Sequence, residues 1–231
     1  MAVPTDSGET FLREVDENLR RDQLETMAKK YGAWIAAAVI LLLAATGGWL
    51  YWQDRQGKAA AQDGEVLAQI YSDIGAQKIG NVPQRLDTLA SESKGAVRAS
   101  AMLARAAVLV EQNDRPGATR EYREVAADGK LPQPYRDLAL IRGTSMEFDA
   151  IPPAQVITRL EPMTKPGNPW FGSAGELTAM ALIKQGKKLE AGRLFAAIAA
   201  DQQVPESLRA RAVQIAGTLG VDASASMPAT Q

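Results

Sequence analysis

The sequence predicts an all-α protein with one membrane-spanning helix, and three observations support this. The 231 residues include 40 Ala but only 13 Val and 11 Ile, and aromatic residues make up 6%. This composition favours closely packed helices over a β-sandwich. One uncharged stretch is long enough to cross a bilayer, and the chain beyond it contains an internal repeat. We therefore expect one transmembrane helix followed by an α-solenoid of helix pairs.

Residues 1–30 come first, and we expect them to form a charged, partly helical arm. They contain seven acidic and five basic residues. A broken apolar stripe runs through the arm, and such a stripe can dock on a partner protein or on the lipid surface. However, Asp22 interrupts the stripe and acidic residues are in excess. The interpretation that we prefer is a solvated helical extension of the membrane anchor.

Residues 31–52 read YGAWIAAAVILLLAATGGWLYW and carry no charge. As a helix these 22 residues span about 33 Å, which matches a hydrocarbon core of about 30 Å. The aromatic residues near the two ends, where rings settle at the membrane interface, are Tyr31, Trp34, Trp49, Tyr51 and Trp52. The preceding 30 residues are too long for the charged start of a signal peptide. The stretch is therefore predicted to be an uncleaved transmembrane helix.

The orientation of this helix follows from the Lys and Arg residues on its two sides, because basic residues are retained on the cytoplasmic side. Those shortly before the span are Arg20, Arg21, Lys29 and Lys30, and those shortly after it are Arg55 and Lys58. We therefore expect a cytoplasmic N-terminus in a bacterial inner membrane. Residues 53–231 would then lie in the periplasm.

An internal repeat organises the rest of the chain. Residues 97–132 align with residues 170–205 without a gap, at an offset of 73 and with 11 identities. Because 73 is close to twice 36, residues 133–169 are expected to hold one degenerate unit of two helices. Pro132, Pro169 and Pro205 separate the units at spacings of 37 and 36. The sequence thus predicts a repeat of two helices and about 36 residues.

The repeat domain is expected to cover residues 97–221. Before it, residues 53–96 are expected to form a connecting helix and a weak helix pair that caps the stack. After the second strong unit, residues 205–220 are predicted to form a lone helix. Residues 222–231 are expected to be a disordered tail.

The paired units resemble the tetratricopeptide repeat. The residues that carry this resemblance are Ala106, Leu109, Ala118, Tyr122 and Val125 in one unit and Ala179, Leu182, Ala191, Phe195 and Ile198 in the other. Small residues let paired helices approach closely, and the aromatic residue fills the space between successive units. The expected fold is therefore a tetratricopeptide-like α-solenoid.

The whole chain resembles the ancillary subunits of the SecYEG translocon. The likeness rests on the order of parts: a charged arm, one span that ends in GGWLYW, and a tetratricopeptide-like domain beyond it. The resemblance implies translocon subunits and a membrane-anchored prolyl isomerase as partners, with a role among periplasmic chaperones. The alternative from another class is a scaffold for cell-envelope or division machinery.

Composition and motifs argue against catalysis. The chain has no Cys and no His, so thiol nucleophiles, His-assisted catalysis and ordinary zinc sites are excluded. Its 26 basic and 27 acidic residues give a net charge of −1, which disfavours a dedicated nucleic-acid binder. The S-x-x-K pattern at residues 91–94 lacks its companion motifs. We expect no enzyme activity, cofactor, metal or small-molecule substrate.

The candidate binding surface is the face lined by the first helix of each unit, because repeat arrays bind partners along such faces. Aligning the two strong units places three residues of each on this face: Leu103, Ala107 and Val110, then Glu176, Met180 and Ile183. An apolar groove there would suit unfolded segments or a partner helix. The competing interpretation is a short stack that closes on itself and packs these residues under the capping helices at residues 65–74 and 206–219.

Overall fold

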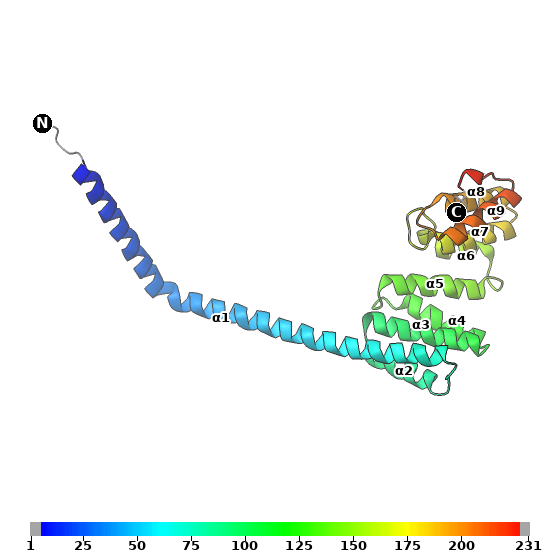
Figure 1. Ribbon diagram of the computed structural model, residues 1–231, viewed down its shortest axis with the longest axis horizontal. Coiled ribbons are helices and arrows are strands. Elements are labelled where there is room, and N and C mark those ends of the chain that lie inside the picture. The colour runs from blue at the N-terminus through cyan, green and yellow to red at the C-terminus, as the bar shows by residue number, and fades with distance from the viewer. Residues whose placement is uncertain (1–5, 227–231) are drawn as a thin grey trace. The chain divides into compact units, whose positions relative to one another are not determined.

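The structure is a computed structural model that describes the backbone of residues 6–226 and the side chains of residues 30–34 and 36–226. This part of the chain is helical and contains no strand, as the sequence predicts. The chain divides into two compact units, and the boundary between them follows Ala59. In chain order the elements labelled in Figure 1 and the short 3₁₀ segments are α1 (Asp6–Gly75), α2 (Val82–Glu92), α3 (Gly95–Glu111), α4 (Arg115–Ala127), α5 (Gln133–Glu147), α6 (Pro153–Leu160), η1 (Glu161–Met163), α7 (Phe171–Lys184), α8 (Lys188–Ala200), α9 (Glu206–Thr218) and η2 (Ser224–Ser226).

α1 contains the predicted membrane span. Within the described residues it is the one helix long and apolar enough to cross a membrane, with a mean hydropathy of 2.0 over its most apolar window. None of that window is buried against other parts of the chain, and Leu41 is 71% exposed. An uninterrupted apolar surface of this kind is typical of contact with lipid. The residues predicted as 31–52 all lie within this helix.

Charged and aromatic side chains meet at both ends of the predicted span. The ammonium group of Lys30 lies 5.5 Å from the centre of the Tyr31 ring, and the guanidinium of Arg55 lies 5.6 Å from that of Tyr51. Such pairs combine an apolar ring with a hydrated charge, which suits the headgroup region. The backbone of the predicted arm is helical from Asp6 onward, but its apolar stripe lies outside the described side chains.

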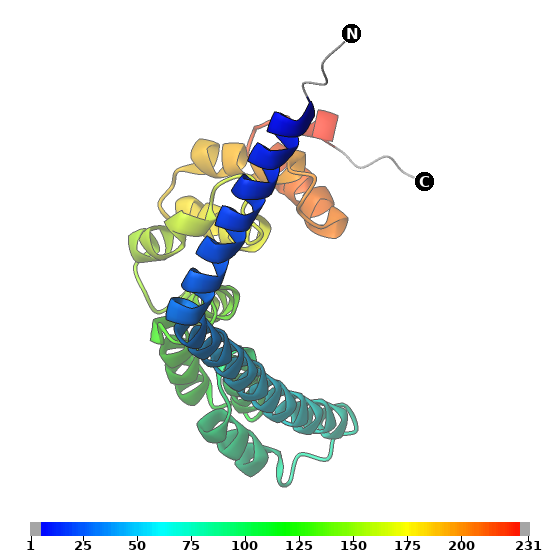
Figure 2. The same cartoon turned by 90° about the vertical axis from the view of Figure 1, so that its left-hand side faces the viewer.

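Residues 60–226 fold into a stack of helix hairpins in which each helix from α2 to α9 contacts the next. Figure 2 shows these helices following a curve from α2 toward α9. The buried side chains form three clusters: one from the end of α1 to α5, one from α5 to α7, and one from α7 to the residues after α9. The apolar core therefore runs along the stack, as in other helical repeats.

The repeat seen in the sequence is present in the helices. α4 and α8 have the same length and begin and end at positions 73 residues apart. α5 and α9 also begin 73 residues apart, at Gln133 and Glu206. Residues 206–218, predicted to be a lone helix, are thus the equivalent of α5. The repeated pattern extends one helix further than the sequence alignment indicated.

The turns between the paired helices repeat as well. Asn113 and Gly186, which are 73 residues apart, both have positive φ, at 61° and 78°. Asn is one of the few residues other than glycine that adopts this conformation readily. In each turn the next amide, of Asp114 or Lys187, donates to the carbonyl five residues back, at 2.9 Å. The two helices therefore end in the same way, although only one turn has a glycine.

Small buried residues recur on the first helix of each unit. Ala106 and Ala179 are among the residues that carry the repeat resemblance, and both are fully buried. Gly143 on α5 and Ala216 on α9 continue the series at spacings of 37, 36 and 37. A Cβ added at Gly143 would lie 3.2 Å from the Cβ of Tyr122 on α4. The degenerate middle unit therefore keeps the helix approach of its neighbours.

The end of the described chain is more ordered than the sequence suggested. Ala223 is buried in the third core cluster, and η2 contacts both α8 and α9. The predicted disordered tail began at residue 222, so these residues depart from that prediction. The physical reason is that Val221 and Ala223 are small aliphatic residues that fit against the last helix pair. Residues 227–231 lie outside the described part.

Ala191 is fully buried, so a larger side chain there should destabilise the fold. Ala191→Leu should overpack the α7–α8 crossing and lower the free energy of unfolding by about 1–3 kcal/mol. Ala118→Leu should do the same in the aligned unit, because both alanines are fully buried. The measurement is thermal unfolding of the full chain in detergent, followed by circular dichroism.

The matched control is Ala200→Leu, because Ala200 ends the same helix and is exposed. An Ala191→Leu protein that melts at the same temperature as this control would contradict the assigned packing.

Candidate functional site

The three candidate residues on α3 are mostly enclosed. Leu103 is 8% exposed and belongs to the first core cluster, and Val110 packs against the same cluster. Ala107, between them, is half-buried. The competing interpretation of a closed stack therefore describes Leu103 well. Ala107 and Val110 keep a partly accessible surface.

The three candidate residues on α7 are more accessible. Met180 is 43% exposed, whereas Glu176 and Ile183 are half-buried. The Glu176 carboxylate accepts a hydrogen bond of 2.8 Å from Arg211 on α9. Part of this face is thus covered by the last helix. α3 and α7 do not touch each other in the described structure, since α5 lies between them and contacts both.

α5 carries the equivalents of all six candidates. The spacings of 37 and 36 that relate Ala106, Gly143 and Ala179 also relate the candidate positions on α3 and α7 to positions on α5. The equivalent residues are Leu140, Thr144 and Glu147. All three line one cavity in the structure. The face predicted from the outer units is therefore hollowed in the middle unit.

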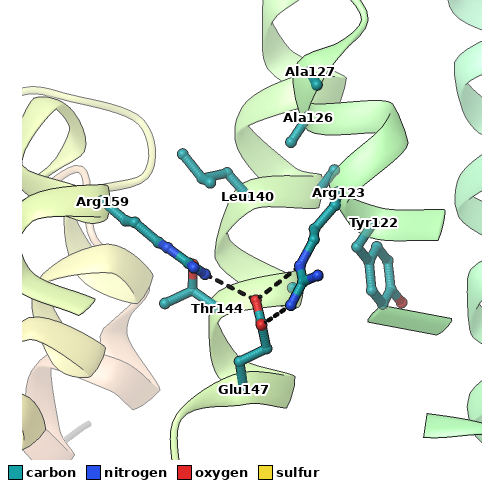
Figure 3. A pocket seen from close by; sticks show the side chains of 10 residues that line it. Tyr122, Arg123, Ala126, Ala127, Leu140, Thr144, Glu147 and Arg159 are labelled. Atoms are coloured by element: carbon teal, nitrogen blue, oxygen red, sulfur yellow. Dashed lines mark hydrogen bonds and ion pairs between the residues drawn. The ribbon is translucent and has the colours of Figure 1, made fainter. Parts of the chain in front are cut away.

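The cavity has a volume of about 290 Å³ and is lined by residues of α4, α5 and α6. Figure 3 shows its lining residues. The walls are apolar and mostly short: Tyr122, Ala126 and Ala127 from α4, and Ala139 and Leu140 from α5. Since alanine side chains fill little space, three of them in one region leave a hollow between helices that otherwise pack closely.

A three-residue ion cluster closes one end of the cavity, and Figure 3 shows its dashed contacts. The Glu147 carboxylate, only 8% exposed, accepts hydrogen bonds from Arg123 on α4 and from Arg159 on α6. The Arg159 bond is 2.8 Å long, and a second bond from Arg123 Nε is 3.4 Å. The cluster therefore joins three consecutive helices through a single carboxylate.

The ion cluster holds Glu147 in its charged form. The hydrogen bond from Arg123 lowers the pKa of Glu147 below its ordinary value, with Arg159 acting in the same direction against the effect of burial. The same hydrogen bond raises the pKa of Arg123. Two guanidinium groups face one carboxylate, so the cluster carries one excess positive charge near neutral pH.

The cavity combines a buried hydroxyl with charged groups that already engage one another. Thr144, at the base of the cavity, is 1% exposed, and its hydroxyl has no hydrogen-bond partner within the described chain. The charged groups are two arginines and a carboxylate already engaged by them, so none is poised to act as a general base. Among the described residues no group of acidic side chains could hold a metal ion. The cavity offers an apolar wall beside a positive rim.

Leu140, Thr144 and Glu147 were not among the candidates predicted from the sequence. The middle unit was too degenerate to align with its neighbours, because α6 is short and departs from the pattern of α4 and α8. The signal that could have found them was the spacing of Pro132 and Pro169, which fixes the register of α5. Arg123 and Arg159 had no such signal, since they meet Glu147 only through the packing of three helices.

Comparisons with known proteins identify one similarity. A family described as the tetratricopeptide repeat-like domain matches residues 27–216, which is most of the chain. No curated protein and no solved structure matches.

The ion cluster makes stability depend on pH. Glu147→Gln should lower the free energy of unfolding by about 1–3 kcal/mol at pH 7, because two arginines lose their carboxylate. The folded-state pKa of Glu147 is depressed, so its contribution is complete above the unfolded value of 4.5 and is lost as pH falls through the folded pKa. The difference in melting temperature between the two proteins should therefore shrink below about pH 4.5.

Thermal unfolding of the full chain in detergent at pH 3 to 8 measures this difference. A difference that stays constant across the whole range would contradict the ionic role of Glu147. Glu161→Gln serves as the control, because Glu161 is exposed.

Proposed function

Because the chain belongs to the tetratricopeptide repeat-like domain family, we propose that it binds other proteins at the secretion translocon. In this proposal the apolar part of α1 anchors it in the bacterial inner membrane, and the helical repeats take part in periplasmic chaperone function. The observation that carries the proposal is the combination, on one chain, of a helix able to cross a membrane and a repeat stack with partly open faces.

The interaction role is supported by how the repeats expose their surface. Met180 on α7 exposes a large, flexible apolar side chain to solvent. Such a side chain can adapt its shape to the apolar surface of a partner. On α5 the position equivalent to Met180 is Thr144, which lines the cavity. Stacked repeats present such positions side by side, which suits extended segments or helices of a partner.

The order of the parts along the chain supports the proposed role at the translocon. A charged arm, a span that ends in GGWLYW and a repeat domain occur in the order typical of the ancillary translocon subunits. Translocon subunits and a membrane-anchored prolyl isomerase are the proposed partners. The repeats would assist secreted chains by binding and not by catalysis, since the sequence has neither Cys nor His.

The proposed orientation places the repeat domain outside the cytoplasm, because the basic residues are more numerous before the span than after it. Single cysteines at Ser7→Cys and Ser224→Cys provide the test, since the natural chain has no Cys. In intact spheroplasts a membrane-impermeant maleimide should label Ser224→Cys only. Ser7→Cys should react after permeabilisation. Labelling of Ser7→Cys alone in intact spheroplasts would overturn this orientation.

The proposed partners can be trapped in cells with photo-crosslinking residues at Met180 and Ile183. We expect crosslinks to translocon subunits or to many secreted chains, and fewer of them when export is blocked. The control is a crosslinker at Arg193, which is exposed on the second helix of the same unit. A single recurrent partner from the division or cell-wall machinery would contradict the translocon assignment and favour an envelope scaffold.

A further inference from the structure

We propose that the cavity between α4, α5 and α6 binds a short segment of a partner protein in which an aliphatic side chain stands next to an aspartate or glutamate. This inference rests on the proposed function, because it assumes that the repeat domain binds proteins. It adds the place of contact and the chemistry of the partner.

The size and the apolar walls of the cavity fit an aliphatic side chain of the partner. Its volume of about 290 Å³ is at the lower limit of pockets that enclose small molecules. Tyr122, Ala126 and Leu140 form apolar walls that offer few polar partners to a ligand. An aliphatic side chain placed there would leave water and gain dispersion contacts without losing hydrogen bonds.

The ion cluster favours a carboxylate next to that aliphatic side chain in the partner. Arg123 donates to Glu147 through Nε and Nη2, and within the described chain Nη1 has no acceptor. Its side chain is 63% exposed, so this donor faces solvent at the edge of the cavity. The cluster has one positive charge in excess of its single carboxylate. A second carboxylate would balance that charge and accept a charge-assisted hydrogen bond.

At the last helix pair, small aliphatic residues of the chain itself cover the helices. α8 and α9 are the equivalents of α4 and α5, and the chain's own η2 contacts both of them. The segment before η2 reads Val-Asp-Ala, and Ala223 is buried. A Cβ added at Gly192 on α8 would lie 2.7 Å from Val221 Cγ2, so Val221 fills the space beside that glycine. The Asp222 carboxylate accepts a hydrogen bond from the Ser224 amide, so the precedent covers the aliphatic side chains and not the charge.

At the α4–α5 pair, Phe148, Asp149 and Ala150 are the counterparts of Val221, Asp222 and Ala223, because they stand 73 residues earlier. The helix that follows α5 is α6, which contacts α5 and α7 but has no contact with α4 among the described residues. Arg159 is the residue of α6 that lines the cavity. Phe148, Asp149 and Ala150 are not among the lining residues, so this segment of the chain leaves the cavity open.

The test is selection of a phage-displayed library of random twelve-residue peptides on the full chain in detergent. Enriched peptides should share an aliphatic residue next to Asp or Glu. Ala127→Phe should weaken their binding by about tenfold or more, because the ring fills the cavity from an exposed position. Ala200→Phe is the matched control, since Ala200 is the equivalent exposed residue at the end of α8.

A second pair of variants tests the charge without filling the cavity. Arg123→Ala should weaken binding of the enriched peptides several-fold and reduce its dependence on salt. Arg120→Ala removes an exposed arginine from the same helix and should change neither. Melting temperatures of all four variants establish that they are folded.

Three outcomes would overturn the inference: no enriched peptide, a consensus without an acidic residue, or equal binding to Ala127→Phe and Ala200→Phe. Self-association of the chain that Ala127→Phe abolishes would instead identify a second copy as the occupant, and would also overturn it. If one of these outcomes occurs while the photo-crosslinker at Met180 still traps translocon subunits or secreted chains, this inference fails and the proposed function stands. If the crosslinker at Met180 traps neither, the proposed function itself fails.

Discussion

The stack depends on one constraint, the small residue that recurs on the first helix of each unit. Ala106, Gly143, Ala179 and Ala216 are all buried, and a larger side chain at any of them would push neighbouring helices apart. At Gly143 even a single added carbon would approach the Tyr122 Cβ to 3.2 Å. Close approach at these positions brings the backbones near enough for the other side chains to interdigitate.

The cavity lies where short alanine side chains on α4 and α5 stand beside polar residues of α5. Where α3 has Ala107 and Val110 and α7 has Met180 and Ile183, α5 has Thr144 and Glu147. A carboxylate at this depth is stable only when it is paired, and Arg123 and Arg159 supply the pairing from both neighbouring helices. The ion cluster holds the three helices together while the short side chains beside it leave space. In the middle unit, the same three helices therefore form both the ion cluster and the cavity.

Much of the fold could be predicted from the sequence, and the reasons are local. The uncharged run at residues 31–52 and the aligned helices α4 and α8 follow from hydropathy and repeat spacing. The ion cluster could not be predicted, because Arg123, Glu147 and Arg159 are 24 and 12 residues apart and their meeting depends on how α6 is placed. Ala223 was missed for a similar reason, since its burial depends on the groove between two other helices. The sequence predicted a candidate face on α3 and α7, whereas the cavity lies at the equivalent positions of α5, the helix whose register was hardest to align.

In the proposed function, the membrane helix and the repeat stack together hold this protein on other proteins at the membrane. Purification of the full chain in mild detergent, followed by mass spectrometry of the proteins that remain bound, tests it most directly. The account predicts that translocon subunits are recovered in amounts comparable with the chain itself, and that they are lost when residues 60–231 are deleted. Recovery of the chain alone, or of the same proteins with and without its repeats, would contradict it.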